Sequence, residues 1–233
     1  MDPKAEFPSS AWIYRSHRQR ADPALVDRNS RMLIVSGISG SGKTSACFLA
    51  AKTLAEAGAS VGGILCKAIL EDGRKTGISC LNMSPEHAGK PWLLATIEPE
   101  CKPRPTAQQL DDTDPQLLRF GMWQFFKEAL KRADEEVVHY LSQIPMDGVH
   151  RTVVFIDEIG PLELDRNLGM QRTLAGLDAV ARGGGLDTTD YIVVARPDIA
   201  RRLSSRWPQS ALLAIDGMSI EMAAESISRR MTW

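Results

Sequence analysis

The sequence predicts an α/β domain of three layers, with a mostly parallel sheet and an inserted β-hairpin. Short, continuous apolar runs such as "RTVVFID" are typical of strands buried on both faces of a parallel sheet. Segments with apolar residues at helical spacing separate these runs, and this alternation favours the α/β class. In "SVGGILCKAILEDGRKTGISCLNM", two β-rich runs flank an Asp-Gly pair, which predicts the hairpin.

The elements are expected in the following order. Residues 32–35 form a first strand, and a helix over residues 46–57 ends at Gly58, a residue suited to a helix C-terminus. After the hairpin, six prolines within residues 85–116 predict a loop or lid. Further helices are expected at 116–143, where one long amphipathic helix is predicted, and at 170–181, 198–206 and 219–231, with strands at "RTVVFID", "DYIVVAR" and "ALLAID".

Two regions follow from this order. Residues 31–233 are predicted to form one domain. Residues 1–30 are polar and contain the basic cluster "YRSHRQR", so we expect a flexible, solvated arm, with an anion or RNA contact as the alternative.

Composition excludes several function classes. The formal net charge of −1 gives no overall field that would attract nucleic acid or a membrane surface, so a small molecule or a protein is the expected partner. No segment approaches the ~20 apolar residues of a membrane span, and we expect a cytoplasmic protein. The four cysteines show no CxxC spacing, which predicts reduced thiols and neither a zinc site nor a disulfide framework.

The segment "GISGSGKT" at residues 37–44 matches the P-loop motif, and it lies between the first predicted strand and the first predicted helix. Its glycines allow backbone N–H groups to approach a polyphosphate, and the helix N-terminus adds partial positive charge. Lys43 is expected to reach the β- and γ-phosphates, and the Thr44 hydroxyl to bind magnesium. The predicted nucleotide-binding residues are Gly37, Ser39, Gly40, Ser41, Gly42, Lys43, Thr44 and Ser45.

Three further side chains are expected at the carboxyl ends of parallel strands, where ligands bind in such sheets. Asp157 is predicted to hold the magnesium ion, and Glu158 to orient or deprotonate a water that attacks the γ-phosphate. Arg196 follows "YIVVA" and is a candidate for stabilising charge in the transition state; the alternative is a surface arginine paired with Asp198 or Glu163.

The hairpin and the aromatic residues offer weaker candidates. Arg74 or Lys75 could lean over the nucleotide, and Phe120 or Trp123 could cover its base. The alternative for the aromatic residues is an ordinary place in the core.

Four segments resemble, in order and spacing, the P-loop nucleoside-triphosphatase family called the THEP or cancer-related NTPase family. They are "GISGSGKT", "VGGILCKAILEDGRKTGISCLN", "RFGMWQFFKEALKRA" and, most specifically, "VVFIDEIGPLEL". The resemblance covers residues 31–203 and implies a RecA-like α/β domain that hydrolyses several nucleoside triphosphates with Mg²⁺. It assigns phosphate and metal to Gly37, Gly40, Gly42, Lys43 and Thr44, and metal and water to Asp157 and Glu158. Three features depart from the family pattern. They are Pro161, where other members often have Lys, the long stretch at residues 85–116, and the N-terminal arm.

The predicted function is therefore Mg²⁺-dependent hydrolysis of ATP, GTP and other nucleoside triphosphates to diphosphate and phosphate. A nucleotide or small-molecule kinase is one alternative, because the same P-loop can pass a phosphoryl group to a bound acceptor. A slow nucleotide-dependent switch is another, with a protein partner at residues 1–30 or 85–116. The Asp157–Glu158 pair favours water as the acceptor.

Overall fold

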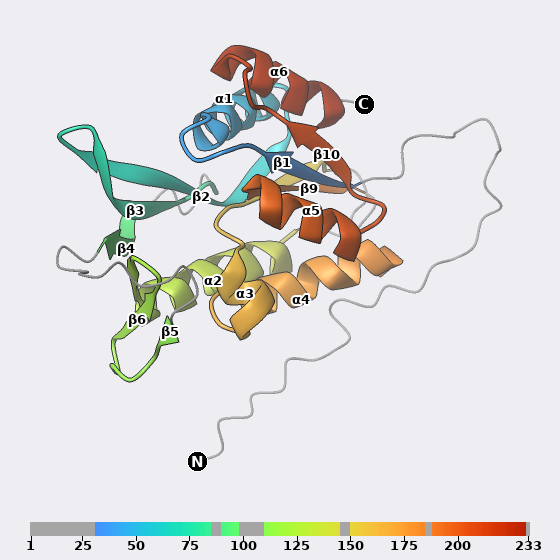
Figure 1. Cartoon of the computed structure of the whole chain (residues 1–233). Coiled ribbons are helices and arrows are strands. Elements are labelled where there is room, and N and C mark those ends of the chain that lie inside the picture. The colour runs from blue at the N-terminus through green and yellow to red at the C-terminus, as the bar shows by residue number, and fades with distance from the viewer. Residues whose placement is uncertain (1–30, 85–89, 98–109, 145–149, 185–187, 232–233) are drawn as a thin grey trace.

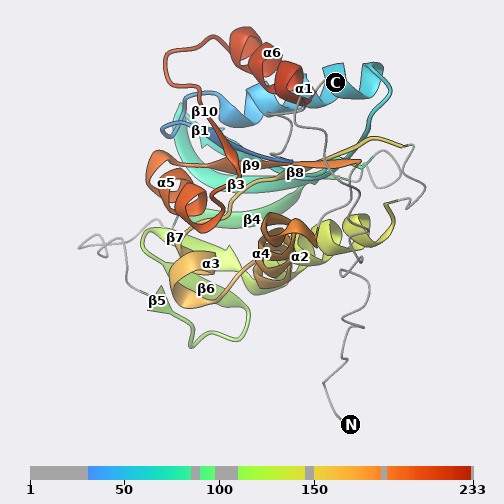
Figure 2. The ribbon, with the colours of Figure 1, turned by 90° about the vertical axis from the view of Figure 1, so that its right-hand side faces the viewer.

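A computed structural model describes residues 31–84, 90–97, 110–144, 150–184 and 188–231. The predicted N-terminal arm lies outside these residues. A sheet separates two helical layers, with α1 and α6 on one face and α2 to α5 on the other (Figures 1 and 2). The helices are α1 (Lys43–Glu56), α2 (Lys127–Ser142), α3 (Pro161–Arg166), α4 (Gln171–Ala179), the π-helical turn η3 (Val180–Gly184), α5 (Pro197–Arg206) and α6 (Ile220–Met231).

The described strands form one sheet in the order β10-β1-β9-β8-β2-β3-β4-β7-β6-β5. The strands from β10 to β2 pair in parallel, and those from β2 to β5 pair antiparallel. The strands are β1 (Met32–Ser36), β2 (Ser60–Glu71), β3 (Arg74–Asn82), β4 (Trp92–Ile97), β5 (Leu110–Asp111), β6 (Leu117–Phe120), β7 (Trp123–Phe126), β8 (Thr152–Ile156), β9 (Thr189–Ala195) and β10 (Ala211–Ala214). The three-layer α/β fold with a hairpin is confirmed, and the antiparallel part is larger than that single hairpin.

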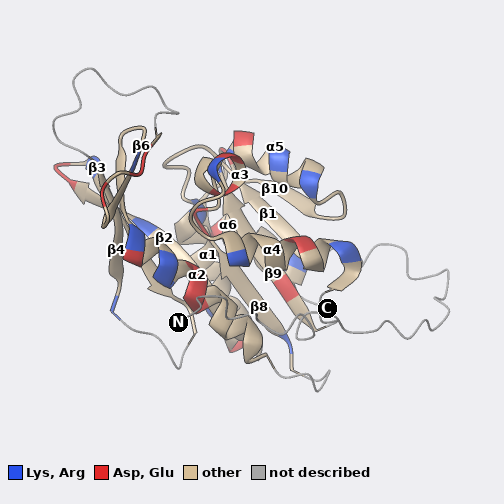
Figure 3. Ribbon diagram, turned by 90° about the horizontal axis from the view of Figure 1, so that it is seen from below, with Lys and Arg blue, Asp and Glu red and all other residues tan. Residues whose placement is uncertain are grey.

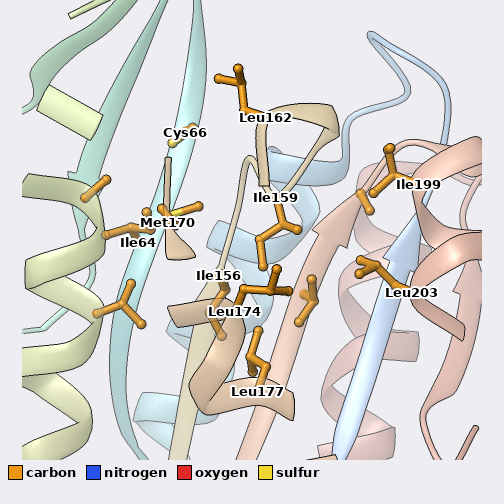
Figure 4. Close-up of a cluster of buried hydrophobic side chains, with 14 of the residues drawn as sticks. Ile64, Cys66, Ile156, Ile159, Leu162, Met170, Leu174, Leu177, Ile199 and Leu203 are labelled. Atoms are coloured by element: carbon orange, nitrogen blue, oxygen red, sulfur yellow. The ribbon is translucent and has the colours of Figure 1, made fainter. Parts of the chain in front are cut away.

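The continuous apolar runs supply both faces of the parallel strands. In β1, Met32 and Ile34 join the core under α2 to α5, whereas Leu33 and Val35 join the core under α1 and α6. The same alternation holds along β8 and β9, because successive side chains of a strand point to opposite faces. Figure 4 shows part of the first core, in which Ile156 of β8 lies near Leu174 and Leu177 of α4.

The strand β2 is long enough to belong to both halves of the sheet. Its first part pairs with β8, and the whole strand from Ile64 onward pairs with β3, so that the hairpin extends away from the helical layers (Figure 1). Gly63 permits a close contact here, because its φ is +88° and a Cβ at this position would lie 2.0 Å from the Phe155 carbonyl oxygen.

The prediction of a helix over residues 116–143 is wrong at its beginning. Residues 117–126 form the hairpin β6–β7, and α2 begins at Lys127. Phe120 pairs with Trp123, so Gly121 and Met122 form a two-residue turn, and Gly121 has the positive φ of 61° that this turn favours.

The prediction of a loop across residues 85–116 needs correction at two places. The segment Trp92–Ile97 is β4, which pairs with β3 and β7, and Leu110–Asp111 is β5. The run "WLLATI" lies between Pro91 and Pro99 and contains no proline, so it can pair on both sides. Residues 85–89 and 98–109 lie outside the described residues.

The prediction that all four cysteines are reduced is also wrong. Cys66 of β2 and Cys80 of β3 form a disulfide, with Cα atoms 4.3 Å apart. The hairpin places them directly opposite each other in neighbouring antiparallel strands, although 14 residues separate them in sequence. Cys47 is a buried free thiol, and Cys101 lies outside the described residues.

Candidate active site

The predicted P-loop follows β1 directly and leads into α1. Gly40 and Gly42 have φ angles of +83° and +85°, which glycine adopts without the steric cost of a side chain. A Cβ at Gly37 would lie 2.4 Å from Ser41 Oγ, so Gly37 also lets the loop close on itself. These glycines let the chain turn sharply between β1 and α1.

Lys43 begins α1 and folds back over the loop. Its Nζ donates to the Gly37 carbonyl oxygen at 2.6 Å and to the Ile38 carbonyl oxygen at 2.7 Å. Burial lowers the pKa of Lys43, and the negative charges of Asp157, Asp216 and Glu158 oppose that shift. The ammonium group therefore lies among carboxylates that surround the phosphate-binding loop.

Asp157 follows β8 and joins the P-loop to the rest of the site. Its Oδ2 lies 3.1 Å from Thr44 Oγ1 and accepts from the Cys66 backbone N–H at 3.1 Å, while its Oδ1 accepts from the Glu158 N–H at 2.9 Å. Thr44 Oγ1 also lies 3.1 Å from the Cys66 carbonyl oxygen. Burial, and then the charge of Glu158, raise the pKa of Asp157.

Glu158 has a left-handed backbone, with φ 70°, which is uncommon for residues other than glycine. Such conformations cost about 1–3 kcal/mol and often occur at functional sites, where the surrounding contacts maintain them. The next residues are firmly held, because Ile159 and Leu162 are buried in the core (Figure 4). Glu158 is partly exposed, whereas Asp157 is buried.

Glu163 holds the loop that carries Glu158. Its side chain is 3% exposed and accepts from the Gly160 N–H at 2.8 Å and the Met170 N–H at 3.1 Å. Burial raises the pKa of Glu163 to about 7. From the sequence, Glu163 was part of the family motif "VVFIDEIGPLEL" and an alternative surface partner for Arg196, whereas in the structure it is buried inside the loop.

Arg196 lies between β9 and α5, at the same edge of the sheet as Asp157. It is exposed, and its charge contributes to lowering the pKa of Lys43, so the two cations lie near one another. Among the described residues, no ion pair joins Arg196 to Asp198 or Glu163.

The other arginines of α5 lie outside the site. Figure 3 shows that basic positions, in blue, recur along α5. Arg202 forms a bidentate pair with Asp165 of α3, and Arg206 forms another with Asp178 of α4 at 2.7 and 2.6 Å. These pairs connect α5 to α3 and α4 on the face of the sheet that carries α2 to α5.

The weaker candidates lie on the antiparallel strands β3, β6 and β7 and make other contacts. Lys75 Nζ lies 4.8 Å from the centre of the Trp123 ring, and Phe120 is only 8% exposed. Two residues close to the P-loop were not predicted: Asp216, which accepts from the Ile38 N–H at 2.8 Å, and Cys66, whose backbone contacts Thr44 and Asp157. Asp216 ends the predicted strand "ALLAID", so the rule that selected Asp157 could also have selected it, whereas nothing in the sequence around Cys66 indicated its backbone contacts.

The residues at this site fit a magnesium ion. Thr44 Oγ1 and Asp157 Oδ2 are two neighbouring oxygen atoms beside the phosphate-binding loop, and Mg²⁺ is commonly held by one or two protein oxygens together with substrate phosphates. The described residues contain no cluster of three or more His, Cys, Asp or Glu side chains that could hold a metal alone.

The fold and the site define a P-loop protein of the nucleoside-triphosphatase class, with the phosphate-binding loop after one parallel strand and an acidic pair after another. Residues 32–174, more than half of the chain, match the NTPase family. The chain therefore belongs to the NTPase family.

One relative supports this assignment, and one solved structure matches the fold. The chain is 32% identical over 163 residues to a nucleoside-triphosphatase THEP1 from Methanopyrus kandleri, an alignment that covers 70% of this chain and 72% of that protein. The solution structure of a human cancer-related nucleoside triphosphatase matches the fold with a TM-score of 0.60 at 17% identity, covering 86% of this chain and 96% of that one. None of the described helices is long and apolar enough to cross a membrane.

Proposed function

We propose that the protein hydrolyses the terminal phosphoanhydride of nucleoside 5′-triphosphates, including ATP and GTP, to diphosphate and phosphate with Mg²⁺. The observation that carries this proposal is the 3.1 Å contact between Thr44 of the P-loop and Asp157 of β8, because it joins the phosphate-binding loop to the acidic pair. Membership of the NTPase family supports the same activity.

Substrate binding uses the backbone of residues 37–44 and the Lys43 ammonium group. The N–H groups of the loop and of the first turn of α1 bind phosphate oxygens, and Lys43 exchanges its two carbonyl acceptors for phosphate oxygens. Asp157 and Glu158 maintain the charge of Lys43 against its partial burial.

The Mg²⁺ ion would be held by Thr44 and Asp157. When bound, it neutralises charge on the phosphate oxygens and orients the terminal phosphoryl group. The three hydrogen-bonded contacts of Asp157, to Thr44, Cys66 and Glu158, hold its carboxylate in place for that task.

Glu158 accepts a proton from the attacking water or orients it by a hydrogen bond. Its position immediately after Asp157 places a second carboxylate beside the metal-binding one, and its left-handed backbone sets the direction of its side chain. Arg196, exposed at the same edge of the sheet, donates to the terminal phosphoryl oxygens and stabilises their charge as the bond to the β-phosphate breaks.

The test is Mg²⁺-dependent release of phosphate from ATP, GTP, CTP and UTP. Glu158→Gln should lower turnover about 100-fold or more while nucleotide binding is retained. Lys43→Ala should lose binding as well as hydrolysis. Lys52→Ala is the matched control, because Lys52 is an exposed lysine on the same helix and pairs with Glu56.

Two results would replace the proposal with another function. Nucleotide binding without phosphate release, followed by diphosphate formation only when an acceptor is added, would indicate a kinase. Binding without either reaction, with a protein partner that depends on the bound nucleotide, would indicate a switch. A cytoplasmic location, and a protein partner for residues 1–30 or 85–116, stay predictions from the sequence.

A further inference from the structure

The backbone between β8 and α3 decides where the Glu158 carboxylate points. This connection consists of residues 157–160, and its φ of 70° at Glu158 lies in the left-handed region. Such a conformation persists only where the surrounding contacts determine it. On the N-terminal side, Asp157 is held by its contacts with Thr44 and Cys66. The C-terminal side of the connection needs a contact of its own.

A single buried carboxylate supplies that contact. Glu163 Oε2 accepts from the Gly160 N–H at 2.8 Å, and Glu163 Oε1 accepts from the Met170 N–H at 3.1 Å. Gly160 ends the connection that carries Glu158. Met170 is 2% exposed and belongs to the core beneath α2 to α5 (Figure 4). The carboxylate therefore links the end of the connection to a fixed point in the core.

The segment between α3 and α4 closes around this carboxylate. Gly169 has a φ of +72°, and a Cβ at this position would lie 2.0 Å from Glu163 Oε1. The Leu168 N–H donates to the Leu162 carbonyl oxygen at 3.0 Å. Gln171 Nε2 donates to the carbonyl oxygens of Glu163 and Leu168 at 3.1 and 2.8 Å. A side chain with a shorter reach, or with one acceptor atom, could not make both contacts of the carboxylate.

A second buried carboxylate also binds the beginning of α4, but it does not bind the connection after β8. Asp134 of α2 is 6% exposed and accepts from the Thr173 N–H at 2.8 Å and from the Arg172 N–H at 3.3 Å. If Glu163 only held α4, the loss of either carboxylate would have the same effect on turnover. The contact with Gly160 distinguishes the two.

We propose that Glu163 is a positioning residue for hydrolysis, which fixes the Gly160 peptide and thereby directs the Glu158 carboxylate toward the attacking water. This inference rests on the proposed function for the role of Glu158. Glu163 acts on turnover and not on nucleotide affinity, because its carboxylate binds the connection after β8 and not the phosphate-binding loop.

The first test separates kcat from affinity in the parent, Glu163→Gln and Asp134→Asn. Phosphate release from ATP with Mg²⁺ gives kcat, and calorimetry gives the Kd of ADP with Mg²⁺. Whichever way its amide turns, Glu163→Gln breaks the link between Gly160 and Met170, so kcat should fall about 10- to 100-fold while the Kd of ADP stays within about twofold. Asp134→Asn is the matched control and should keep kcat within about twofold.

The second test asks whether Glu163 acts through Glu158. In a Glu158→Gln protein there is no carboxylate left to direct, so adding Glu163→Gln should change the residual turnover by less than about twofold. Tryptophan fluorescence shows whether each protein is folded. Glu163→Asp, whose shorter side chain cannot reach both N–H groups, replaces Glu163→Gln if that variant does not fold.

Several results would overturn this inference alone. They are an unchanged kcat in the Glu163 variant, an equal fall of kcat in Asp134→Asn, a weakening of ADP that matches the fall in kcat, and a full loss of residual turnover on adding Glu163→Gln to Glu158→Gln. A parent that binds ADP but releases no phosphate from ATP would instead overturn the proposed function, and this inference with it.

Discussion

The buried carboxyl group of Glu163 provides a quantitative prediction about stability and pH. Its pKa is raised from an ordinary value of 4.5 to about 7, chiefly by burial. The folded protein therefore holds this proton more tightly than the unfolded chain does. The stability that the proton contributes is fully present below pH 4.5 and is lost as the pH rises through 7, a change of about 3 kcal/mol.

The substitution Glu163→Gln removes this titration. The glutamine has one oxygen for the Gly160 and Met170 N–H groups, so one donor loses its acceptor, at a cost of about 1–3 kcal/mol at low pH. As the pH rises to 8, the parent loses stability and the variant does not, so the difference between the two should close or reverse. This difference in the free energy of unfolding is measured by urea unfolding at pH values between 4.5 and 8, with tryptophan fluorescence as the signal.

The comparison isolates Glu163 because the other groups titrate in both proteins. Burial also raises the pKa values of Asp157 and Asp190, and those contributions cancel in the difference between parent and variant. Glu71→Gln, at an exposed hairpin residue, serves as the control and should follow the parent at every pH. Parallel curves for the parent and Glu163→Gln would refute the reasoning.

Three further predictions concern the backbone, the disulfide and the arginine. Gly63→Ala should lower the free energy of unfolding, measured in urea, by about 2–5 kcal/mol, because the new Cβ would overlap the Phe155 carbonyl at a positive φ. Gly73→Ala should lower it less, because no atom lies within 4 Å of a Cβ there. Equal losses in the two variants would contradict this account. Alkylation without reductant, followed by peptide mapping, should recover Cys66 linked to Cys80, whereas two alkylated thiols would show that the pair is reduced. Arg196→Ala should lower turnover at least about tenfold with little change in nucleotide affinity, while the neighbouring Arg201→Ala should not; unchanged turnover in Arg196→Ala would remove its catalytic role.

The P-loop and the acidic pair could be predicted because each is contained in a short run of sequence. The spacing of residues 37–44 between a strand and a helix determines the loop, and the parallel strands bring Asp157 to the same edge as Thr44. The contact between them then follows from general rules of α/β sheets. The left-handed conformation of Glu158 does not follow from those rules, since nothing in the sequence distinguishes this residue from an ordinary strand end.

The antiparallel half of the sheet was the part that sequence predicted least well. The apolar residues from Phe126 onward have true helical spacing, and extending that pattern backward hid the β6–β7 hairpin at Gly121. Asp216 and Cys66 were missed for a different reason. Their contacts with the P-loop and Asp157 join residues that are 178 and 91 positions apart, and periodicity carries no information about such pairs.

The unequal lengths of β2 and β8 explain how Thr44 and Asp157 are brought together. The two strands pair only as far as Ile64 and Ile156, so the next backbone groups of β2 have no ladder partner on that side. At Cys66, the N–H donates to Asp157 and the carbonyl oxygen accepts from Thr44, which satisfies both groups. The side chains of Thr44 and Asp157 thus complete the edge of a strand that continues into the hairpin. The pairing of Cys66 with Cys80 fixes the register of β2 against β3. The hairpin therefore supports the geometry of the active site through the backbone of Cys66. Among the described residues, no hairpin side chain forms a hydrogen bond with the P-loop motif.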